Sequence, residues 1–316
     1  MENAAGVCYD SVIKGQAAAP LSDGEAEPMQ NAAPREVRLR DELLEKIREL
    51  GADCAGVASV DALRNGPSER LFPNMKDRTR DRFAGEVTTG LPHGAVYWEE
   101  DARSVLVFGV EHPGSKPELD WWCGEINPPG NRKLLAISRA FIRYLREEHP
   151  GIAVYDKRYH VERGGLYLKD AAVMAGLGCI GRSNLLVTPR FGPRVRLRAL
   201  TLSEPLAPTG PIDFDPCAGC AAPCIRYCPQ NAFTQRVYTP EETGLDRLPG
   251  RDGSYFRAAC HEQMLLDEER ATEGSMPEVS DRPAKIIKYC RNCELLCAWP
   301  PREGHTDAPA GEEKGS

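Results

Sequence analysis

The sequence predicts a mixed α/β (α+β) domain followed by a smaller cysteine-rich module. Helical and strand-like hydrophobic patterns alternate from residue 35 to about residue 205, which is typical of helices layered on a sheet. Residues 206–300 hold eight of the chain's twelve cysteines and are rich in proline, with only short stretches of helical pattern. At 316 residues, the chain has the length of about two domains.

The two ends of the chain differ in composition from these parts. Residues 1–34 are rich in Ala, Gly, Pro and acidic residues without hydrophobic periodicity, and residues 301–316 are polar and acidic. Such segments bury too little apolar surface to offset the loss of chain entropy. We therefore expect a disordered lead-in, an α/β domain at 35–205, the cysteine module at 206–300 and a disordered tail.

The α/β domain is predicted to alternate helices and strands in chain order. An apolar stripe at helical spacing runs from Val37 to Ile47. The continuous apolar run at 104–110 has the length of a strand that is buried on both faces. The other predicted elements are strands at 53–60, 152–161, 184–187 and 195–202, and helices at 131–148 and 166–175.

Two cysteine-rich runs dominate the module. The first reads C-A-G-C-A-A-P-C-I-R-Y-C-P and the second C-R-N-C-E-L-L-C. Closely spaced cysteines, the last followed by proline, form the half-motif of bacterial-type ferredoxins, whose thiolates ligate iron–sulfur clusters. Since a four-iron cluster needs four thiolates, the eight cysteines predict two [4Fe–4S] clusters in a bacterial ferredoxin-like module.

The crossover pattern of two-cluster ferredoxins assigns the last cysteine of each run to the other cluster. The first cluster is then predicted to bind Cys217, Cys220, Cys224 and Cys297, and the second Cys228, Cys260, Cys290 and Cys293. Three residues rather than two separate Cys220 from Cys224, and Ala298 replaces the proline that normally follows. Structural zinc bound by the C-x2-C pairs and a disulfide scaffold are the alternatives.

Composition limits the partners and the compartment. No basic segment followed by an apolar one occurs near the start, so we expect no secretory signal and a reducing, cytoplasmic environment. No apolar run reaches the ~18 residues of a membrane span, so we expect no membrane partner. The net charge of −7 argues against nucleic acid, and the alternating arginines of 190–198 indicate a solvated or anion-facing strand side.

The glycine-rich turn carries a resemblance to a known superfamily. The stretch L-K-D-A-A-V-M-A-G-L-G-C-I-G-R-S-N-L-L, followed by G-P-R-V-R-L and the cysteine runs, resembles epoxyqueuosine reductases and reductive dehalogenases. S-V-L-V-F-G-V near residue 107 is similar too, and the resemblance covers roughly residues 36–300. It implies a nitroreductase-like domain that binds cobalamin against the cluster module, with the clusters passing single electrons to cobalt.

The resemblance also implies a proton donor. Glu162 falls at the position of the acidic donor of epoxyqueuosine reductases, although the D-S-A-P-type segment around it is absent. Tyr159, His160 and Tyr167 are alternative donors nearby. Structural hydrogen bonding is the other interpretation of each of these residues.

The same resemblance predicts contacts between the turn and the cofactor. Gly176, Gly178 and Gly181 would let the backbone approach a cofactor closely, and Arg182 and Asn184 would add polar contacts. A helix C-cap followed by a tight turn is the alternative explanation of the glycines.

Together these patterns predict an oxygen-sensitive iron–sulfur oxidoreductase that uses a corrinoid to reduce a small organic substrate, with electrons from an external low-potential donor. The alternatives are an electron-transfer or corrinoid-reactivating protein and a tRNA-modifying epoxyqueuosine reductase. The tRNA-acting members resemble longer proteins with a C-terminal helical-repeat extension, whereas this acidic chain ends soon after its last cysteine. We therefore expect that tRNA is not the substrate.

Overall fold

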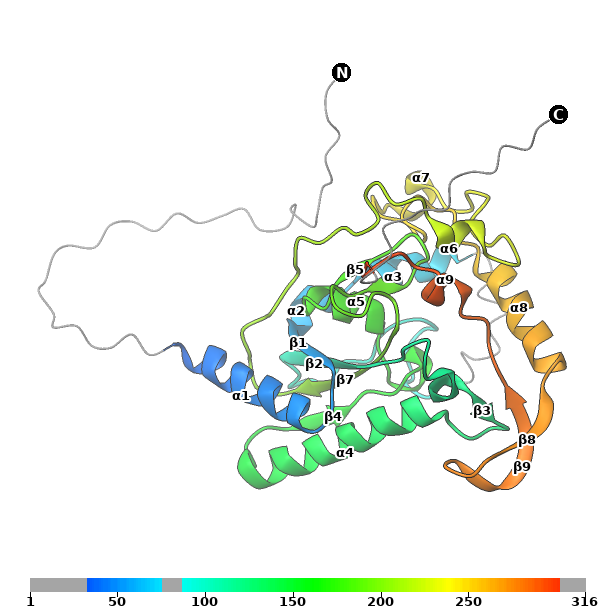
Figure 1. Ribbon diagram of the computed structural model, residues 1–316. Helices are drawn as coiled ribbons and strands as arrows, with labels where there is room; N and C mark the ends of the chain where they lie inside the picture. Colours follow the sequence, from blue (N-terminus) through cyan, green and yellow to red (C-terminus); the bar gives the residue numbers. More distant parts are fainter. Residues whose placement is uncertain (1–32, 76–86, 302–316) are drawn as a thin grey trace, which may run out of the picture.

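The computed structural model describes residues 33–75 and 87–301. The predicted lead-in and tail lie outside the described residues, except for residues 33, 34 and 301. Figure 1 shows a central sheet between helices, with the cysteine-rich segments along its upper right side. Within the described residues, no helix is both long and apolar enough to cross a membrane.

An antiparallel sheet forms the centre of the α/β domain. Its strand order is β1 (Cys54–Ser59), β2 (Ser104–Glu111), β7 (Val195–Leu202) and β4 (Val154–Asp156). The mixed α/β class is confirmed, and β2 and β7 match the strands predicted at 104–110 and 195–202. The strand predicted at 152–161 is shorter, because the chain turns back after Asp156 so that Arg158 bridges Gly165.

Helices cover both faces of this sheet, which explains why β2 is apolar throughout. One face carries α1 (Arg35–Glu49) and α4 (Pro129–Glu148), and the other carries α5 (Leu168–Met174). Successive strand side chains point to opposite faces. Leu106 and Phe108 therefore enter the core beneath α1 and α4, whereas Val105 and Val107 enter the core beneath α5.

Shorter elements complete the α/β domain. They are α2 (Val60–Leu63), α3 (Pro67–Leu71), β3 (Trp122–Cys123), β5 (Cys179–Ile180), β6 (Leu186–Val187) and 3₁₀ turns η1 (Phe72–Asn74), η3 (Pro117–Asp120) and η4 (Val161–Arg163). Strands β5 and β6 pair with each other and carry the second half of the glycine-rich turn. Turn η4 lies in the loop between β4 and α5.

The cysteine module combines four short helices with one hairpin that the sequence patterns did not predict. The helices are α6 (Pro223–Arg226), α7 (Pro240–Thr243), α8 (Arg257–Glu269) and α9 (Asn292–Leu295). The hairpin consists of β8 (Thr272–Met276) and β9 (Ser280–Ile287). Strand β9 also pairs with β3, so a three-stranded sheet connects the module to the α/β domain.

Candidate functional site

The structure places the eight predicted ligand cysteines in two groups. The first group lines a small, largely enclosed cavity and consists of Cys217, Cys220, Cys224 and Cys297. Burial raises the pKa of Cys224 to about 11, and charges on Cys297, Cys217 and Cys220 contribute to the rise. These thiols are therefore close enough to interact. They are the four cysteines assigned to the first cluster from the sequence, and their ligation of iron stays a prediction.

The second group consists of Cys228, Cys260, Cys290 and Cys293. Burial raises the pKa of Cys260, with further contributions from the charges of Cys228 and Cys290. Burial also raises the pKa of Cys293, followed by the charges of Glu294, Cys260 and Cys290. Cys290 is exposed, whereas the other seven cysteines of the two groups are buried or half-buried. The second group therefore reaches the surface at one edge.

Both groups offer the donor set that an iron–sulfur cluster requires. The thiols within each group lie close enough for their charges to interact, and thiolates bind both iron–sulfur clusters and zinc. Within the described residues, His, Cys, Asp and Glu side chains nowhere converge in threes as closely as a single bound ion requires. All four cysteines of the first group line one cavity, together with other residues that include Arg182 and Trp299. These residues fit a cluster.

A buried ion-pair network, defined here as His112, Asp120, Arg196, Arg291 and Glu294, lies beside the second group. Asp120 Oδ2 is 2.7 Å from Arg291 Nη1, and Asp120 Oδ1 is 2.9 Å from Arg196 Nε. Glu294 is 2.8 Å from both arginines. Although burial opposes it, the hydrogen bond from His112 and the charges of both arginines hold the pKa of Asp120 below its ordinary value.

The arginines of β7 pair with carboxylates. This agrees with the interpretation of residues 190–198 as a solvated or anion-facing side of a strand. Arg196 pairs with Asp120 and Glu294, and Arg198 lies 2.6 Å from Asp156. Because Arg291 and Glu294 stand between the predicted ligand cysteines of the second run, the network fixes that run against β7. The charged residues inside the second cysteine run were the only feature of the sequence that pointed to this network.

Glu162 lies in η4 with its side chain 6% exposed. Its Oε1 is 3.2 Å from His93 Nδ1, and its backbone carbonyl accepts a hydrogen bond from the N–H of Thr88 at 2.8 Å. Tyr167 donates its hydroxyl to the carbonyl of Gly94 at 2.8 Å. Burial raises the pKa of Tyr167, and the charge of Glu162 contributes. His93, which no sequence pattern singled out, is thus the partner of this carboxyl group.

The other two predicted donors are more exposed than Glu162, and His160 is half-buried. Tyr159 is 73% exposed. Its ring meets that of His160 edge-on, with centroids 5.1 Å apart. Exposure therefore distinguishes these side chains from the buried Glu162, while the catalytic role of all three stays a prediction.

The glycine-rich turn packs against its own chain. Gly176 ends α5 with φ +71°, and a Cβ there would lie 2.6 Å from the carbonyl oxygen of Thr209. A Cβ on Gly178 would lie 2.1 Å from the carbonyl oxygen of Val187, and one on Gly181 would lie 2.7 Å from a methyl group of Val187. Each glycine is therefore needed for contacts within the protein, as expected for a C-cap and a tight turn.

The polar residues of the turn also contact the protein. Arg182 Nη1 donates to the carbonyl of Cys220 at 3.5 Å, and Asn184 Oδ1 accepts from the N–H of Gly250 at 3.4 Å. The carbonyl of Asn184 accepts from Lys169 Nζ at 2.7 Å. The turn thus joins α5 to the cysteine module. These residues form no open cradle for a corrinoid, so we derive no step through that cofactor, and their contact with it stays a prediction.

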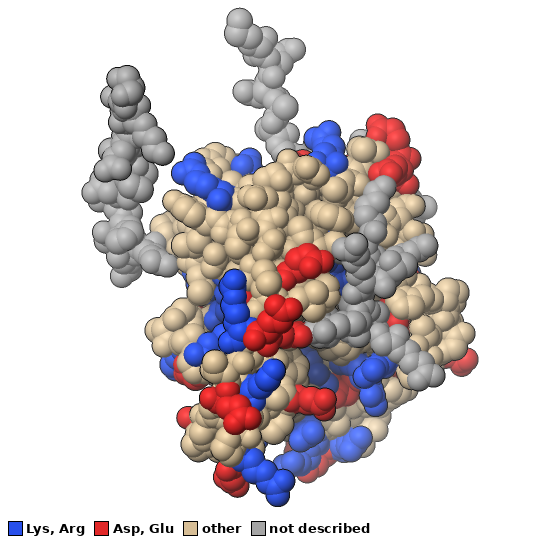
Figure 2. Space-filling model, turned by 90° about the vertical axis from the view of Figure 1, so that its right-hand side faces the viewer, with Lys and Arg blue, Asp and Glu red and all other residues tan. Residues whose placement is uncertain are grey.

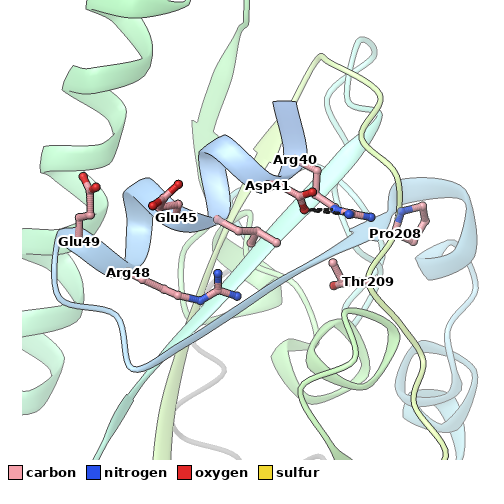
Figure 3. Close-up of a pocket in the computed structure, with 8 residues that line it drawn as sticks. Arg40, Asp41, Glu45, Arg48, Glu49, Pro208 and Thr209 are labelled. Atoms are coloured by element: carbon pink, nitrogen blue, oxygen red, sulfur yellow. Dashed lines mark hydrogen bonds and ion pairs between the residues drawn. The ribbon is translucent and has the colours of Figure 1, made fainter. Parts of the chain in front are cut away.

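A shallow groove lies elsewhere, between α1 and the segment that carries Pro208 and Thr209 (Figure 3). Most of the side chains that line it are charged, including Arg40 and Arg48. Thr209 donates its hydroxyl to the carbonyl of Ala175 at 2.7 Å, so this segment supports the end of α5. The groove contains none of the site residues predicted from the sequence.

No protein-family model matches the chain. A tetrachloroethene reductive dehalogenase of Sulfurospirillum multivorans is 40% identical over 83 residues, 25% of this chain and 16% of the relative. An epoxyqueuosine reductase of Lactococcus garvieae is 23% identical over 214 residues, 63% of this chain and 52% of the relative. The chain thus spans no more than about half the length of these two relatives.

The crystal structure of an epoxyqueuosine reductase with a tRNA-Tyr epoxyqueuosine-modified stem loop has a similar fold. Its TM-score is 0.53 at 18% identity, over 82% of this chain and 64% of that one. At 18% sequence identity, this similarity shows a shared fold alone. The resemblance inferred from the sequence is confirmed, because the similar proteins and structures are epoxyqueuosine reductases and reductive dehalogenases.

Proposed function

We propose that this chain is an iron–sulfur oxidoreductase of the epoxyqueuosine reductase and reductive dehalogenase type. The observation that carries the proposal is that the eight cysteines fall into two sets of four whose charges interact, one of which lines a largely enclosed cavity. Bound [4Fe–4S] clusters would supply single electrons at low potential. In this proposal residues 35–205 form a nitroreductase-like domain, and residues 206–300 form a ferredoxin-like module that an external low-potential donor reduces.

Glu162 is the proton donor in this proposal. Reduction of an organic substrate consumes protons as well as electrons, and a carboxyl group positioned by a partner can deliver them. Glu162 is buried, and its Oε1 is 3.2 Å from His93 Nδ1, so the imidazole holds the carboxyl group in one orientation. In this proposal the carboxyl group passes a proton to a substrate that reaches it.

The proposal extends to a corrinoid and a small organic substrate, which the resemblance to the two enzyme families supports. The glycine-rich turn contributes no cradle to this part of the proposal, because its residues contact the protein itself. We therefore assign no residue to corrinoid binding beyond the sequence-based prediction.

A tRNA-modifying epoxyqueuosine reductase is the second candidate. It is favoured by the similar fold of an enzyme whose structure contains a modified tRNA stem loop. Against it, the net charge is −7, and the face shown in Figure 2 intersperses acidic and basic side chains, whereas phosphate binding normally gathers Lys and Arg. The expectation that nucleic acid is not the substrate stays a prediction.

Metal analysis of the anaerobically purified chain tests the proposal. We expect about eight irons and eight sulfides per chain, as two four-iron clusters require. A chain that carries zinc, or about four irons, would contradict the two-cluster proposal. Added cobalamin should give a base-off spectrum, and absence of binding would favour an electron-transfer protein. An electrophoretic shift with tRNA would favour the second candidate.

Glu162→Gln tests the proton donor. It keeps the shape of the side chain but removes its acidic proton, so turnover should fall by about 10²–10⁴-fold while iron content is unchanged. Glu100→Gln, at an exposed position before β2, is the matched control and should leave turnover unchanged. Undiminished turnover in Glu162→Gln would remove this residue from the mechanism.

A further inference from the structure

Arg251 connects the glycine-rich turn to the first cysteine group. Its Nε donates to the carbonyl of Ile180 at 2.8 Å, and its Nη1 lies 2.7 Å from Asp215 Oδ1. Its Nη2 donates to the sulfur of Cys179 at 3.4 Å. All three nitrogens of the guanidinium are therefore engaged, and the planar group has one orientation.

The backbone of Arg251 adopts a conformation that non-glycine residues rarely adopt. Its φ is +75°, and the preceding Gly250 has φ +72°. The N–H of Arg251 donates to the carbonyl of Leu248 at 2.7 Å, which closes the turn. A left-handed conformation is unfavourable for a residue with a Cβ. Strain of this kind at a fixed side chain is a reason to ask what the side chain does.

Asp215 connects the guanidinium to Cys217, the first of the predicted ligand cysteines. Asp215, the ion-pair partner of Arg251, also accepts a hydrogen bond from the N–H of Cys217 at 3.0 Å. Although burial opposes it, the hydrogen bond to Asp215 and the charge of Cys217 raise the pKa of Arg251. Arg251 therefore keeps its positive charge within interaction range of a sulfur of the first group.

The two charges of the pair are not equally screened. The side chain of Asp215 is 44% exposed, whereas that of Arg251 is 19% exposed. Water weakens the field of an exposed charge more than that of a buried one. The positive end of the pair therefore dominates on the side that faces the thiols, although Asp215 offsets part of its effect.

We propose that Arg251 sets the reduction potential of the first cluster. The inference rests on the proposed function, because it requires a cluster bound by the first cysteine group. Reduction adds one negative charge to a cluster, and nearby charges and hydrogen bonds to sulfur adjust its potential. A fixed cation stabilises the reduced cluster, and Arg251 therefore raises the potential of this cluster above that of an otherwise identical site.

Potentiometric titrations of the whole chain, followed by electron paramagnetic resonance, test this inference. Arg251→Gln should shift the potential of one cluster to more negative values and leave the other unchanged. Arg251→Lys keeps the charge without the planar donor set and should give a smaller shift in the same direction. Arg236→Gln removes one positive charge from an exposed position of the same module and should shift neither potential.

Asp215→Asn separates a charge effect from a structural one. Asparagine can still accept the hydrogen bonds from Cys217 and Arg251, but the offsetting negative charge is gone. The potential of the same cluster should therefore shift to more positive values, opposite to Arg251→Gln. A structural disturbance would not shift the reduction potential in opposite directions in the two variants.

Three results would overturn the inference. The first is an Arg251→Gln protein with full iron content and unchanged potentials. The second is a negative shift in Asp215→Asn. If Arg251→Gln fails to assemble a cluster, the Arg251→Lys and Asp215→Asn proteins test the inference in its place. Unchanged potentials in both of these proteins are the third result that would overturn it. A wild-type chain without iron would instead contradict the proposed function, which metal analysis of the wild type detects directly.

Discussion

The two cysteine groups are held in different ways. The first lines an enclosed cavity against the glycine-rich turn, where Arg182 binds the carbonyl of Cys220. The second is fixed to β7 by the buried ion-pair network and reaches the surface at Cys290. If both bind clusters, the second is the one that an external electron donor can approach, and the first is the internal one.

Charge interactions also indicate that the two groups are neighbours. After burial, the charges of Glu294, Cys260 and Cys290 raise the pKa of Cys293, and Cys224 of the first group contributes as well. An electron that enters at the exposed group would therefore have a short path to the enclosed one. The comparison suggests a direction of electron flow, from the surface at Cys290 to the α/β domain.

The largest difference between the two groups is expected in the iron that the protein retains after one cysteine of either group is removed. Cys224→Ala should lose one whole cluster, about four of eight irons, because no other ligand can replace a thiolate in an enclosed cavity. Cys290→Ala should retain more iron, since water or an added thiol can reach this exposed position.

Iron and sulfide analysis of both proteins measures this difference, and Cys54→Ala, in β1, is the control that should retain all the iron. Equal losses in Cys224→Ala and Cys290→Ala would contradict the distinction between an enclosed group and an exposed one.

The parts that could be predicted from the sequence are those whose signal is local. A continuous apolar run predicts β2, a stretch in which arginines alternate with apolar residues predicts β7, and both strands occur nearly to the residue. The spacing of the cysteines likewise predicts two sets of four, and the assignment of these sets to clusters stays a prediction. The hairpin of β8 and β9 was missed because its side chains are mostly half-buried or exposed and show no clean alternation.

Interactions between distant residues could not be predicted. His93 and Glu162 lie on separate loops, and a lone histidine gives no signal. Arg291 and Asp120 are far apart in the sequence but lie 2.7 Å from each other in the structure. The glycines of the turn show a different limit. A glycine required by close packing, such as Gly176 against Thr209, looks the same in sequence as one required by a cofactor.

The ion-pair network should contribute strongly to the stability of the second group. Asp120→Asn removes one of the two carboxylates that pair with Arg196 and Arg291, while Glu294 still pairs with both, and it should lower the free energy of unfolding by about 1.5–3 kcal/mol. Asp61→Asn is the matched control, because Asp61 is 98% exposed at 3.7 Å from Arg64 and its pair should contribute at most about 1 kcal/mol.

Denaturant unfolding at several pH values measures both variants. The pKa of Asp120 is lowered in the folded state, so its stabilisation is present above the unfolded value of about 4 and is lost as the pH falls through the lowered pKa. The difference between wild type and Asp120→Asn should therefore shrink in acid. A difference that grows in acid, or equal effects of Asp120→Asn and Asp61→Asn, would show that the network does not hold the second run.

The smallest expected effect is that of a glycine substitution in the turn that supports the first group. Gly176 and Gly164 have similar backbone conformations, with φ of +71° and +83°, so alanine strains both alike. A Cβ on Gly176 would lie 2.6 Å from the carbonyl oxygen of Thr209, whereas a Cβ on Gly164 would meet no atom within 4 Å. Gly176→Ala should therefore cost about 1–3 kcal/mol more than Gly164→Ala in unfolding free energy.

Because Thr209 leads directly into the segment that ends at Cys217, Gly176→Ala should also lower the iron content of the first group, while Gly164→Ala leaves it unchanged. Equal unfolding free energies with full iron in both proteins would mean that the turn is free to move away from Thr209. The glycines would then be better explained by close approach to a cofactor than by packing within the chain.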